Sequence, residues 1–319
     1  MRHLLDRHIL FFGGKGGVGK TTSAAAFSLA ASRAGRRVLL VSTDPAHSTS
    51  DVFEAGIGPV EREILPGLWG LELDAAREAR RYVDEAKARM SGLFGPAVLA
   101  EAARQIELTA SMPGVADLAI FDRMSDLVLS RAGAYDLVAF DTAPTGHALQ
   151  MLRMPDRLSA WVAALAARRR QGLEAAALAS PASARGERPA DPVLGILEAR
   201  QARLEALRRE LARGERVAFV LVLIPERLPI EESVRAAHDL AEAGIAMGGL
   251  VVNRVLPAEA SGAYYEARKA QERVYLEEIA RRMPSAPRAT VPQLESDVHG
   301  IAGLERVAAC LLAESAPRG

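Results

Sequence analysis

The chain has 319 residues, of which 40 are basic, 40 are acidic and one is a cysteine. This length is enough for one large α/β domain or two smaller ones. A net charge of zero argues against a nucleic-acid binder with a basic face, since phosphate affinity scales with the number of cations. A single cysteine excludes a disulfide framework, an iron–sulfur cluster and a cysteine-rich zinc module within one chain.

Short apolar runs alternate along the chain with longer segments that are rich in alanine and arginine. The apolar runs predict strands at 8–13, 36–43, 68–73, 135–140, 216–224 and 245–253. The longer segments predict helices at 20–34, 75–91, 95–131, 146–170, 193–213, 229–243, 260–283 and 301–314. The core strands are apolar on both faces, as buried parallel strands are. We therefore expect an α/β fold with a doubly wound, mostly parallel sheet, whose ligands bind beyond the carboxyl ends of the strands.

We expect a single domain over residues 1–319, interrupted by helical insertions at about 75–131 and 155–213. Within the second insertion, residues 177–192 are rich in Ala, Pro, Ser and Gly and predict a flexible linker. The N-terminal segment carries charged residues within its apolar stretch and does not resemble a signal peptide. No apolar run approaches the ~18–20 residues of a membrane-spanning helix. These features predict a cytoplasmic protein that is not an integral membrane protein.

A glycine-rich segment, GGKGGVGKTT, follows the first predicted strand at residues 13–22 and precedes a predicted helix. Within it, Gly14, Gly19, Lys20 and Thr21 satisfy the phosphate-loop pattern G-x-x-x-x-G-K-[ST]. Glycines let backbone N–H groups surround phosphate oxygens, Lys20 would contact the β- and γ-phosphates, and Thr21 would ligate Mg²⁺. The pattern predicts a P-loop NTPase core that binds ATP and Mg²⁺. The expected nucleotide-binding residues of the loop are Gly14, Lys15, Gly16, Gly17, Val18, Gly19, Lys20, Thr21 and Thr22.

The same glycines also fit a dinucleotide-binding fingerprint, G-x-G-x-x-G, through Gly14, Gly16 and Gly19. Asp44, which follows the second predicted strand, could then contact the ribose of a nicotinamide or flavin cofactor in an oxidoreductase. Such a site has no use for Lys20 and Thr21, so the residues favour the ATPase interpretation.

Lys15 is not required by a phosphate loop and could be a solvated surface charge. However, the chain contains only four lysines, and Lys15 and Lys20 are two of them. This scarcity favours a specific role for Lys15. The role we expect is a contact with a phosphate across a dimer interface, much as an arginine finger stabilises a transferring phosphoryl group.

Two aspartates end core strands beside the phosphate loop in this architecture. Asp141 follows the predicted strand 135–140, and Asp44 follows 36–43. Each could merely cap a turn or helix. Phosphoryl transfer, however, needs a carboxylate in the Mg²⁺ shell and a group that orients the attacking water, and both aspartates are placed to serve.

Three motifs together resemble one known family. The segments GGKGGVGKTT, DPAHSTSD and DTAPTGH are similar to those of the ATPases that drive arsenite pumps or target tail-anchored membrane proteins. Looser matches at 111–124, 223–233, 251–256 and 292–304 extend the resemblance over nearly the whole chain. The resemblance implies a Mg²⁺-dependent ATPase that opens and closes as a homodimer.

The resemblance also implies roles for individual residues. Lys15 would contact the nucleotide of the partner subunit, Asp44 would orient the attacking water, and Asp141 would organise the Mg²⁺ shell. Glu226 matches a position that contacts nucleotide across the dimer. Asn253 matches the reader of adenine, and the loop from Pro292 matches the one that covers the base.

We expect a chaperone or targeting factor whose client is a segment of a tail-anchored or other membrane protein; the alternative is the motor of an arsenite or anion pump, whose client is a membrane pump subunit. Cys310 alone cannot form a multi-thiolate arsenite site, and no C-x-x-C zinc motif is present. The six histidines show no metal-ligand spacing. A partitioning ATPase is a further alternative, but that class lacks the DPAHS and DTAPTGH motifs.

Apolar residues of the first insertion could line a groove for such a membrane segment, or they could simply pack the insertion onto the sheet. Two residues of the second insertion could add to the groove. The residues concerned are Met90, Phe94, Met112, Leu118, Phe121, Met124, Leu127, Trp161 and Val162.

Overall fold

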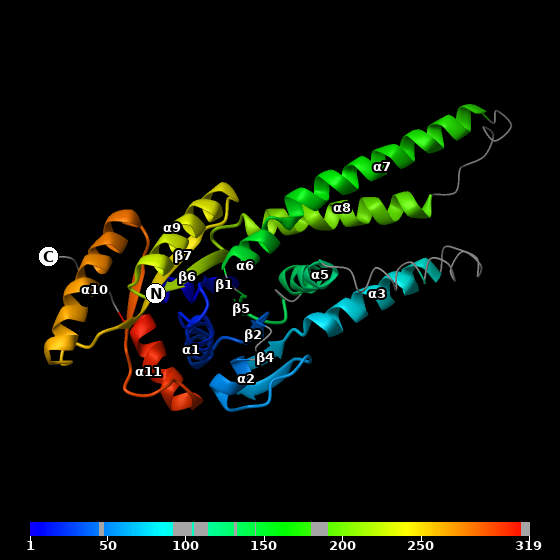
Figure 1. Cartoon of the computed structure of the whole chain (residues 1–319). Helices are drawn as coiled ribbons and strands as arrows, with labels where there is room; N and C mark the ends of the chain where they lie inside the picture. The colour runs from blue at the N-terminus through cyan, green and yellow to red at the C-terminus, as the bar shows by residue number, and fades with distance from the viewer. Residues whose placement is uncertain are drawn as a thin grey trace.

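A computed structural model describes residues 1–44, 48–91, 104, 114–130, 133–143, 145–179 and 191–313 (Figure 1). Its eight-stranded sheet has the order β3-β4-β2-β5-β1-β6-β7-β8. All neighbouring strands are parallel except β3 and β4. The strands are β1 (Ile9–Gly14), β2 (Val38–Ser42), β3 (Arg62–Leu65), β4 (Leu68–Glu72), β5 (Leu137–Asp141), β6 (Val217–Leu223), β7 (Met247–Val255) and β8 (Arg288–Pro292). The predicted doubly wound, mostly parallel α/β fold is confirmed.

Helices cover both faces of the sheet, so the core has two halves. Successive residues of β1 enter opposite halves. Phe11 stacks on Phe140 at a ring-centroid distance of 4.8 Å, and Phe12 packs against Phe27 of α1 at 5.9 Å. The helices are α1 (Lys20–Arg33), α2 (Ser48–Phe53), α3 (Ala75–Ser91), α5 (Val115–Ser130), α6 (Thr145–Leu152), α7 (Met154–Ala179), α8 (Pro192–Leu211), α9 (Arg227–Glu242), α10 (Ala263–Arg282) and α11 (Gly300–Leu312).

The two predicted insertions form helix pairs that extend away from the sheet, α3 with α5 and α7 with α8 (Figure 1). The pairs are joined through α5 and α8, because Arg200 donates to Asp122 at 2.9 Å and Arg203 pairs with Asp126 at 2.6 Å. Most of the predicted linker 177–192 lies outside the described residues, and the single-domain assignment stays a prediction. Among the described residues, none of the helices combines the length and the apolar composition that a membrane span requires.

The residues considered for an apolar groove mostly serve the core. Phe121, Met124 and Leu127 of α5 are fully buried among core residues, and Leu118 packs against them. Val162 is buried as well, whereas Trp161 is 62% exposed. Phe94, Met112 and the side chain of Met90 lie outside the described residues. The described part of α5 therefore packs the first insertion onto the sheet.

Candidate functional site

The phosphate loop joins the end of β1 to the start of α1, and its glycines are required by close packing and by backbone conformation. A Cβ on Gly14 would lie 2.2 Å from the carbonyl oxygen of Val222 and 2.8 Å from Val18 Cγ2. Gly17 and Gly19 have φ angles of 78° and 94°, in the left-handed region that favours glycine. A residue with a side chain could not follow this path without displacing its neighbours.

Lys20 is the first residue of α1, and its side chain is buried against the loop. Its Nζ donates to the carbonyl oxygen of Lys15 at 3.3 Å, so the ammonium group lies inside the curve of the loop. Gly19 is the N-cap residue of α1 and offers no side-chain hydrogen bond to the helix. A helix N-terminus of this kind, with an ammonium group beside it, forms a binding site for an anion such as a phosphate.

Asp141 ends β5, between β1 and β2, and is completely buried. Burial raises the pKa of its carboxyl group to about 7, with a further rise from the negative charge of Asp44, while the Thr21 hydroxyl and the charge of Lys20 oppose the shift. Neither carboxylate oxygen accepts a well-formed hydrogen bond within the described part of the chain, although the Thr21 hydroxyl is close enough to stabilise the charged form. A buried carboxylate beside a hydroxyl fits the oxygen ligands that Mg²⁺ prefers.

Asn253 and Pro292 line a cavity next to Gly19 and Thr22, at the point where the loop enters α1. The Asn253 side-chain amide donates to the carbonyl oxygen of Val18 at 2.8 Å, and a Cβ on Gly19 would lie 2.2 Å from the same nitrogen. A cavity of about 210 Å³ opens here between the starts of α1 and α11 and the ends of β7 and β8. Its lining includes Gly19, Thr22, Asn253, Arg254, Val291, Pro292, Gln293, Leu294, Ser296, Asp297, Val298 and Val307.

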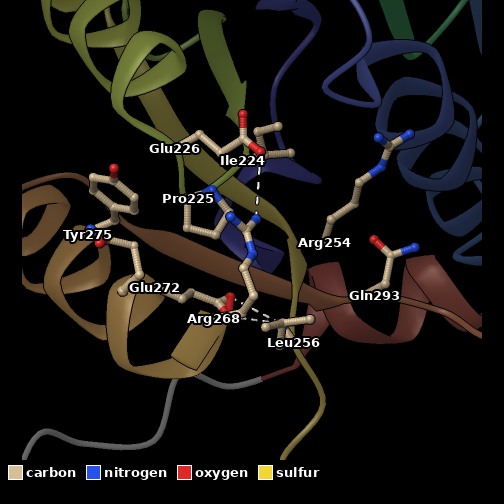
Figure 2. Close-up of a pocket in the computed structure, with 10 residues that line it drawn as sticks. Ile224, Pro225, Glu226, Arg254, Leu256, Arg268, Glu272, Tyr275 and Gln293 are labelled. Carbon is tan, nitrogen blue, oxygen red and sulfur yellow. Dashed lines mark hydrogen bonds and ion pairs between the residues drawn. The ribbon is translucent and has the colours of Figure 1, made fainter. Parts of the chain in front are cut away.

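Lys15 and Glu226 face a different cavity, of about 530 Å³, between the phosphate loop, the start of α9 and α10. Lys15 Nζ lies 3.7 Å from Glu232 Oε1 of α9. Glu226 lies 3.9 Å from Arg268 of α10, and both residues also line an adjoining cavity of about 230 Å³ (Figure 2). The structure thus gathers the predicted site residues around the loop, with Asn253 and Pro292 on one side and Lys15 and Glu226 on the other.

A family model of anion-transporting ATPases matches residues 7–313. This chain belongs to that family. It is 32% identical over 296 residues to a putative arsenical pump-driving ATPase 2 of Aquifex aeolicus, covering 92% of this chain and 95% of that protein. It is also 30% identical over 331 residues to the ATPase GET3 of Chaetomium globosum, covering 99% and 94%. The ATPase ARSA1 of Chlamydomonas reinhardtii is 34% identical over 290 residues, which cover 84% of this chain but 37% of that protein.

The family membership identifies the protein as an ATPase and confirms the predicted resemblance. An ATPase activity overturns the oxidoreductase alternative, whereas the roles expected of the individual loop residues stay predictions. Two residues at the site were missed from the sequence, Glu232 and Arg268. Glu232 lies within the looser match at 223–233, whereas Arg268 belongs to none of the motifs, and each approaches the loop because α9 and α10 pack beside it.

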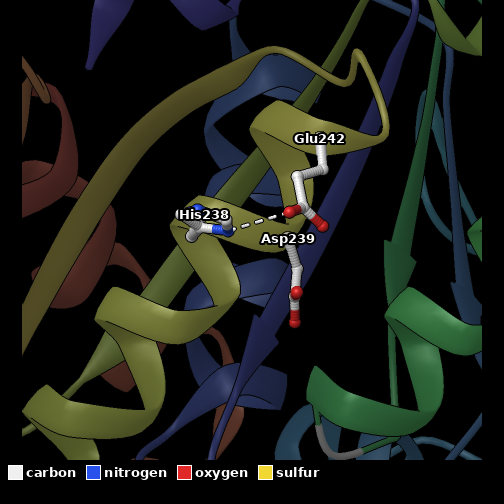
Figure 3. A group of neighbouring side chains, drawn as sticks. All are labelled: His238, Asp239 and Glu242. Carbon is white, nitrogen blue, oxygen red and sulfur yellow. Dashed lines mark ion pairs between the residues drawn. The ribbon is translucent and has the colours of Figure 1, made fainter.

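Within the part of the chain that the structure describes, one further group of side chains has the geometry of metal ligands, contrary to the expectation from histidine spacing. His238, Asp239 and Glu242 of α9 place ligand atoms within 4.8 Å of one another, and His238 lies 3.5 Å from Glu242 (Figure 3). The i, i+4 spacing of His238 and Glu242 was the available signal. Arg153 already pairs with both carboxylates, at 3.4 Å from Asp239 and 2.9 Å from Glu242. We assign this cluster to the packing of α9 against Arg153, the residue between α6 and α7.

Proposed function

We propose that this ATPase is Mg²⁺-dependent and works as a homodimer in the cytoplasm, with a nucleotide of each copy contacted by Lys15 of the other. The observation that supports the Mg²⁺ site is the fully buried carboxylate of Asp141, which lies beside the Thr21 hydroxyl and the charge of Lys20. The observation that supports the dimer is the position of Lys15, which lies on the cavity side of the loop while Lys20 occupies its interior.

Each residue of the loop, and each of the two aspartates beside it, then has a separate role. Lys20 and the N–H groups at the start of α1 bind the β- and γ-phosphates. Thr21 and Asp141 hold Mg²⁺, which neutralises charge on the phosphates when it is bound. Asp44 orients the attacking water. Lys15 supplies positive charge to the phosphates of the partner copy, as an arginine finger does.

The nucleotide base is proposed to occupy the cavity of about 210 Å³. Asn253 would contact the edge of adenine, and the loop from Pro292 would cover its face. Glu226 would face the nucleotide of the partner copy from the opposite cavity. The position of these residues around a single loop supports the assignment.

Substitution of the two loop lysines tests this proposal. Lys20→Ala should abolish ATP binding, measured by titration with a fluorescent ATP analogue. Lys15→Ala should keep ATP binding by the single chain but lose ATP-driven dimer formation and hydrolysis. Lys87→Ala, on α3 away from the loop, is the matched control and should retain both. Normal hydrolysis by Lys15→Ala protein would contradict the proposed action across the dimer.

The Mg²⁺ site needs its own measurement. In wild-type protein, ATP should bind more tightly with Mg²⁺ than with EDTA. Asp141→Asn should reduce this difference, because the amide removes the negative charge of the ligand. Asp44→Asn should keep the difference and slow hydrolysis. An unchanged Mg²⁺ effect in Asp141→Asn protein would remove Asp141 from the metal site.

We further propose that the output is the targeting of tail-anchored or other membrane proteins. An arsenite or anion pump motor is the second candidate, favoured by the name of the Aquifex aeolicus relative. Cys310 argues against thiolate ligation, because it packs partly buried on α11 and burial raises the pKa of its thiol. Arsenite should therefore leave the ATPase rate unchanged. Stimulation of the wild type that disappears in Cys310→Ser protein would favour the pump motor.

A further inference from the structure

The cavity of about 530 Å³ beside Lys15 carries an excess of positive charge. Among the described residues, Lys15, Arg227 and Arg268 line it together with Glu226, and Glu232 lies beside Lys15, so three cations face two carboxylates. In the adjoining cavity, Glu272 is already engaged, because its two oxygens accept hydrogen bonds from the backbone N–H of Leu256 at 2.9 and 3.0 Å. The volume lies within the ~300–1,000 Å³ of ligand pockets, and the charge suits an anionic ligand.

Two of these cations are held by long, exposed ion pairs to helix α9. Lys15 lies 3.7 Å from Glu232, and Arg268 lies 3.9 Å from Glu226, with 53% of the Arg268 side chain exposed. Figure 2 shows Arg268 extending from α10 toward Glu226. Glu226 is the N-cap residue of α9, yet its side chain makes no capping hydrogen bond. Ion pairs of this length and exposure are weak, so either cation can exchange its partner.

We propose that Arg268 is a second cation that acts across the dimer, contacting the phosphates of the nucleotide bound to a second copy of this chain. The proposal rests on the homodimer of the proposed function, and it adds a residue on α10 to the action of Lys15. Glu226 and Glu232 hold the two cations in the free chain and release them when the second copy presents its nucleotide. A guanidinium group suits this task, because its planar fork binds phosphate oxygens in pairs.

Substitutions of Arg268 separate this role from ATP binding by the single chain. Arg268→Gln should leave ATP affinity unchanged in dilute protein but raise the protein concentration for half-maximal ATPase rate by about tenfold or more. Arg268→Lys should be intermediate, since it keeps the charge without the fork. Arg273→Gln, an exposed change on α10 outside both cavities, should behave as wild type. Equal weakening of ATP binding in dilute Arg268→Gln protein would place Arg268 at its own nucleotide and overturn the proposal.

Mixed dimers decide whether Arg268 acts on its own copy or on the partner's. A dimer of Asp44→Asn and Arg268→Gln chains has one complete site, formed by Asp44 of the second chain and Arg268 of the first. An equal mixture should recover about one quarter of the wild-type rate, because half of randomly formed dimers are mixed. The Asp44→Asn, Arg268→Gln double variant mixed with wild type should instead lower the rate. No recovery in the first mixture would overturn the proposal.

The wild type separates failure of this inference from failure of the homodimer. A wild-type rate per chain that does not rise with protein concentration, with no dimer formed in a non-hydrolysable ATP analogue, would overturn the homodimer itself. A wild type that shows both effects, together with an Arg268→Gln variant that matches it, would overturn only the role of Arg268.

Discussion

A single methyl group added to the phosphate loop tests how tightly Asn253 and the loop are coupled. Gly19 has φ 94° and ψ 31°, and a Cβ there would lie 2.2 Å from Asn253 Nδ2. The left-handed backbone costs a non-glycine residue about 1–2 kcal/mol. The clash also displaces the Asn253 amide from the Val18 carbonyl oxygen, a loss of about 1 kcal/mol. Gly19→Ala should therefore lower the free energy of unfolding by about 2–3 kcal/mol.

A double-mutant cycle isolates the clash. Asn253→Ala alone should cost about 1 kcal/mol, and in its background Gly19→Ala should cost only the backbone strain. The two changes together should then cost about 1 kcal/mol less than their sum, measured by urea unfolding. Gly17→Ala is the matched control, because Gly17 has φ 78° but no atom within 4 Å of its Cβ position. Additivity of Gly19→Ala and Asn253→Ala within about 0.5 kcal/mol would refute the reasoning.

Three further outcomes follow from packing and charge. Phe121→Ala should lower the free energy of unfolding by about 3–5 kcal/mol, measured in urea, because the ring is buried in the core. A loss of stability well below this range would contradict the burial of Phe121 and would favour an exposed groove on α5. Arg153→Gln should cost about 1 kcal/mol by the same assay, less in high salt, since Arg153 binds α9 through Asp239 and Glu242. Hydrogen bonds and charge from Arg37 hold the pKa of Asp136 below its usual 3.8 in the folded protein. The pair therefore stabilises the fold fully above pH 3.8, and this stabilisation is lost as the pH falls through the lowered pKa of the folded state. Asp136→Asn should flatten acid unfolding in that range; an unchanged profile would show that the pair contributes nothing.

Central strands could be predicted from the sequence more readily than edge strands. β1, β2, β5 and β6 are buried along their whole length, and each is an apolar run apart from the terminal Ser42 of β2 and Asp141 of β5. The edge strands β3 and β8 were missed, because a short strand with one pairing neighbour needs no such run. Gly67, with φ 81° between β3 and β4, follows Pro66 and was a usable turn signal.

Helix boundaries and the role of the first insertion were also predicted incompletely from the sequence. The predicted helix 146–170 is two helices, α6 and α7, which meet at Arg153 just before Pro155. Because proline is favoured in the first turn of a helix, the position of Pro155 could have predicted that a new helix begins there. The apolar face of α5 could not be assigned from the sequence, because a buried face and an exposed groove have the same composition.

The residues of the candidate site also fall into those that the sequence predicts and those that it does not. The loop residues and the strand-end Asp141 are local signals, set by the spacing of glycines and by the end of an apolar run. Glu232 and Arg268 are ordinary charged residues of two helices, and the carboxylate of one and the guanidinium of the other approach the loop only through tertiary packing. Glu232 lies in the looser match at 223–233, but neither that match nor any pattern around Arg268 marks these two side chains among the many charges that face water.

The hydrogen bond between Asn253 and Val18 leaves the amide only partly used. An asparagine side chain offers two donors and one acceptor, and one donor is committed to the loop carbonyl. The remaining N–H and the carbonyl oxygen form a donor–acceptor pair, the combination with which asparagine pairs an adenine edge. If Asn253 binds the base as proposed, one rigid amide spans the base and the backbone next to Gly19. A nucleotide whose base does not pair with the Asn253 amide would then displace the backbone of the phosphate loop. Selectivity for adenine would therefore affect the rate of ATP hydrolysis as well as the affinity for the nucleotide.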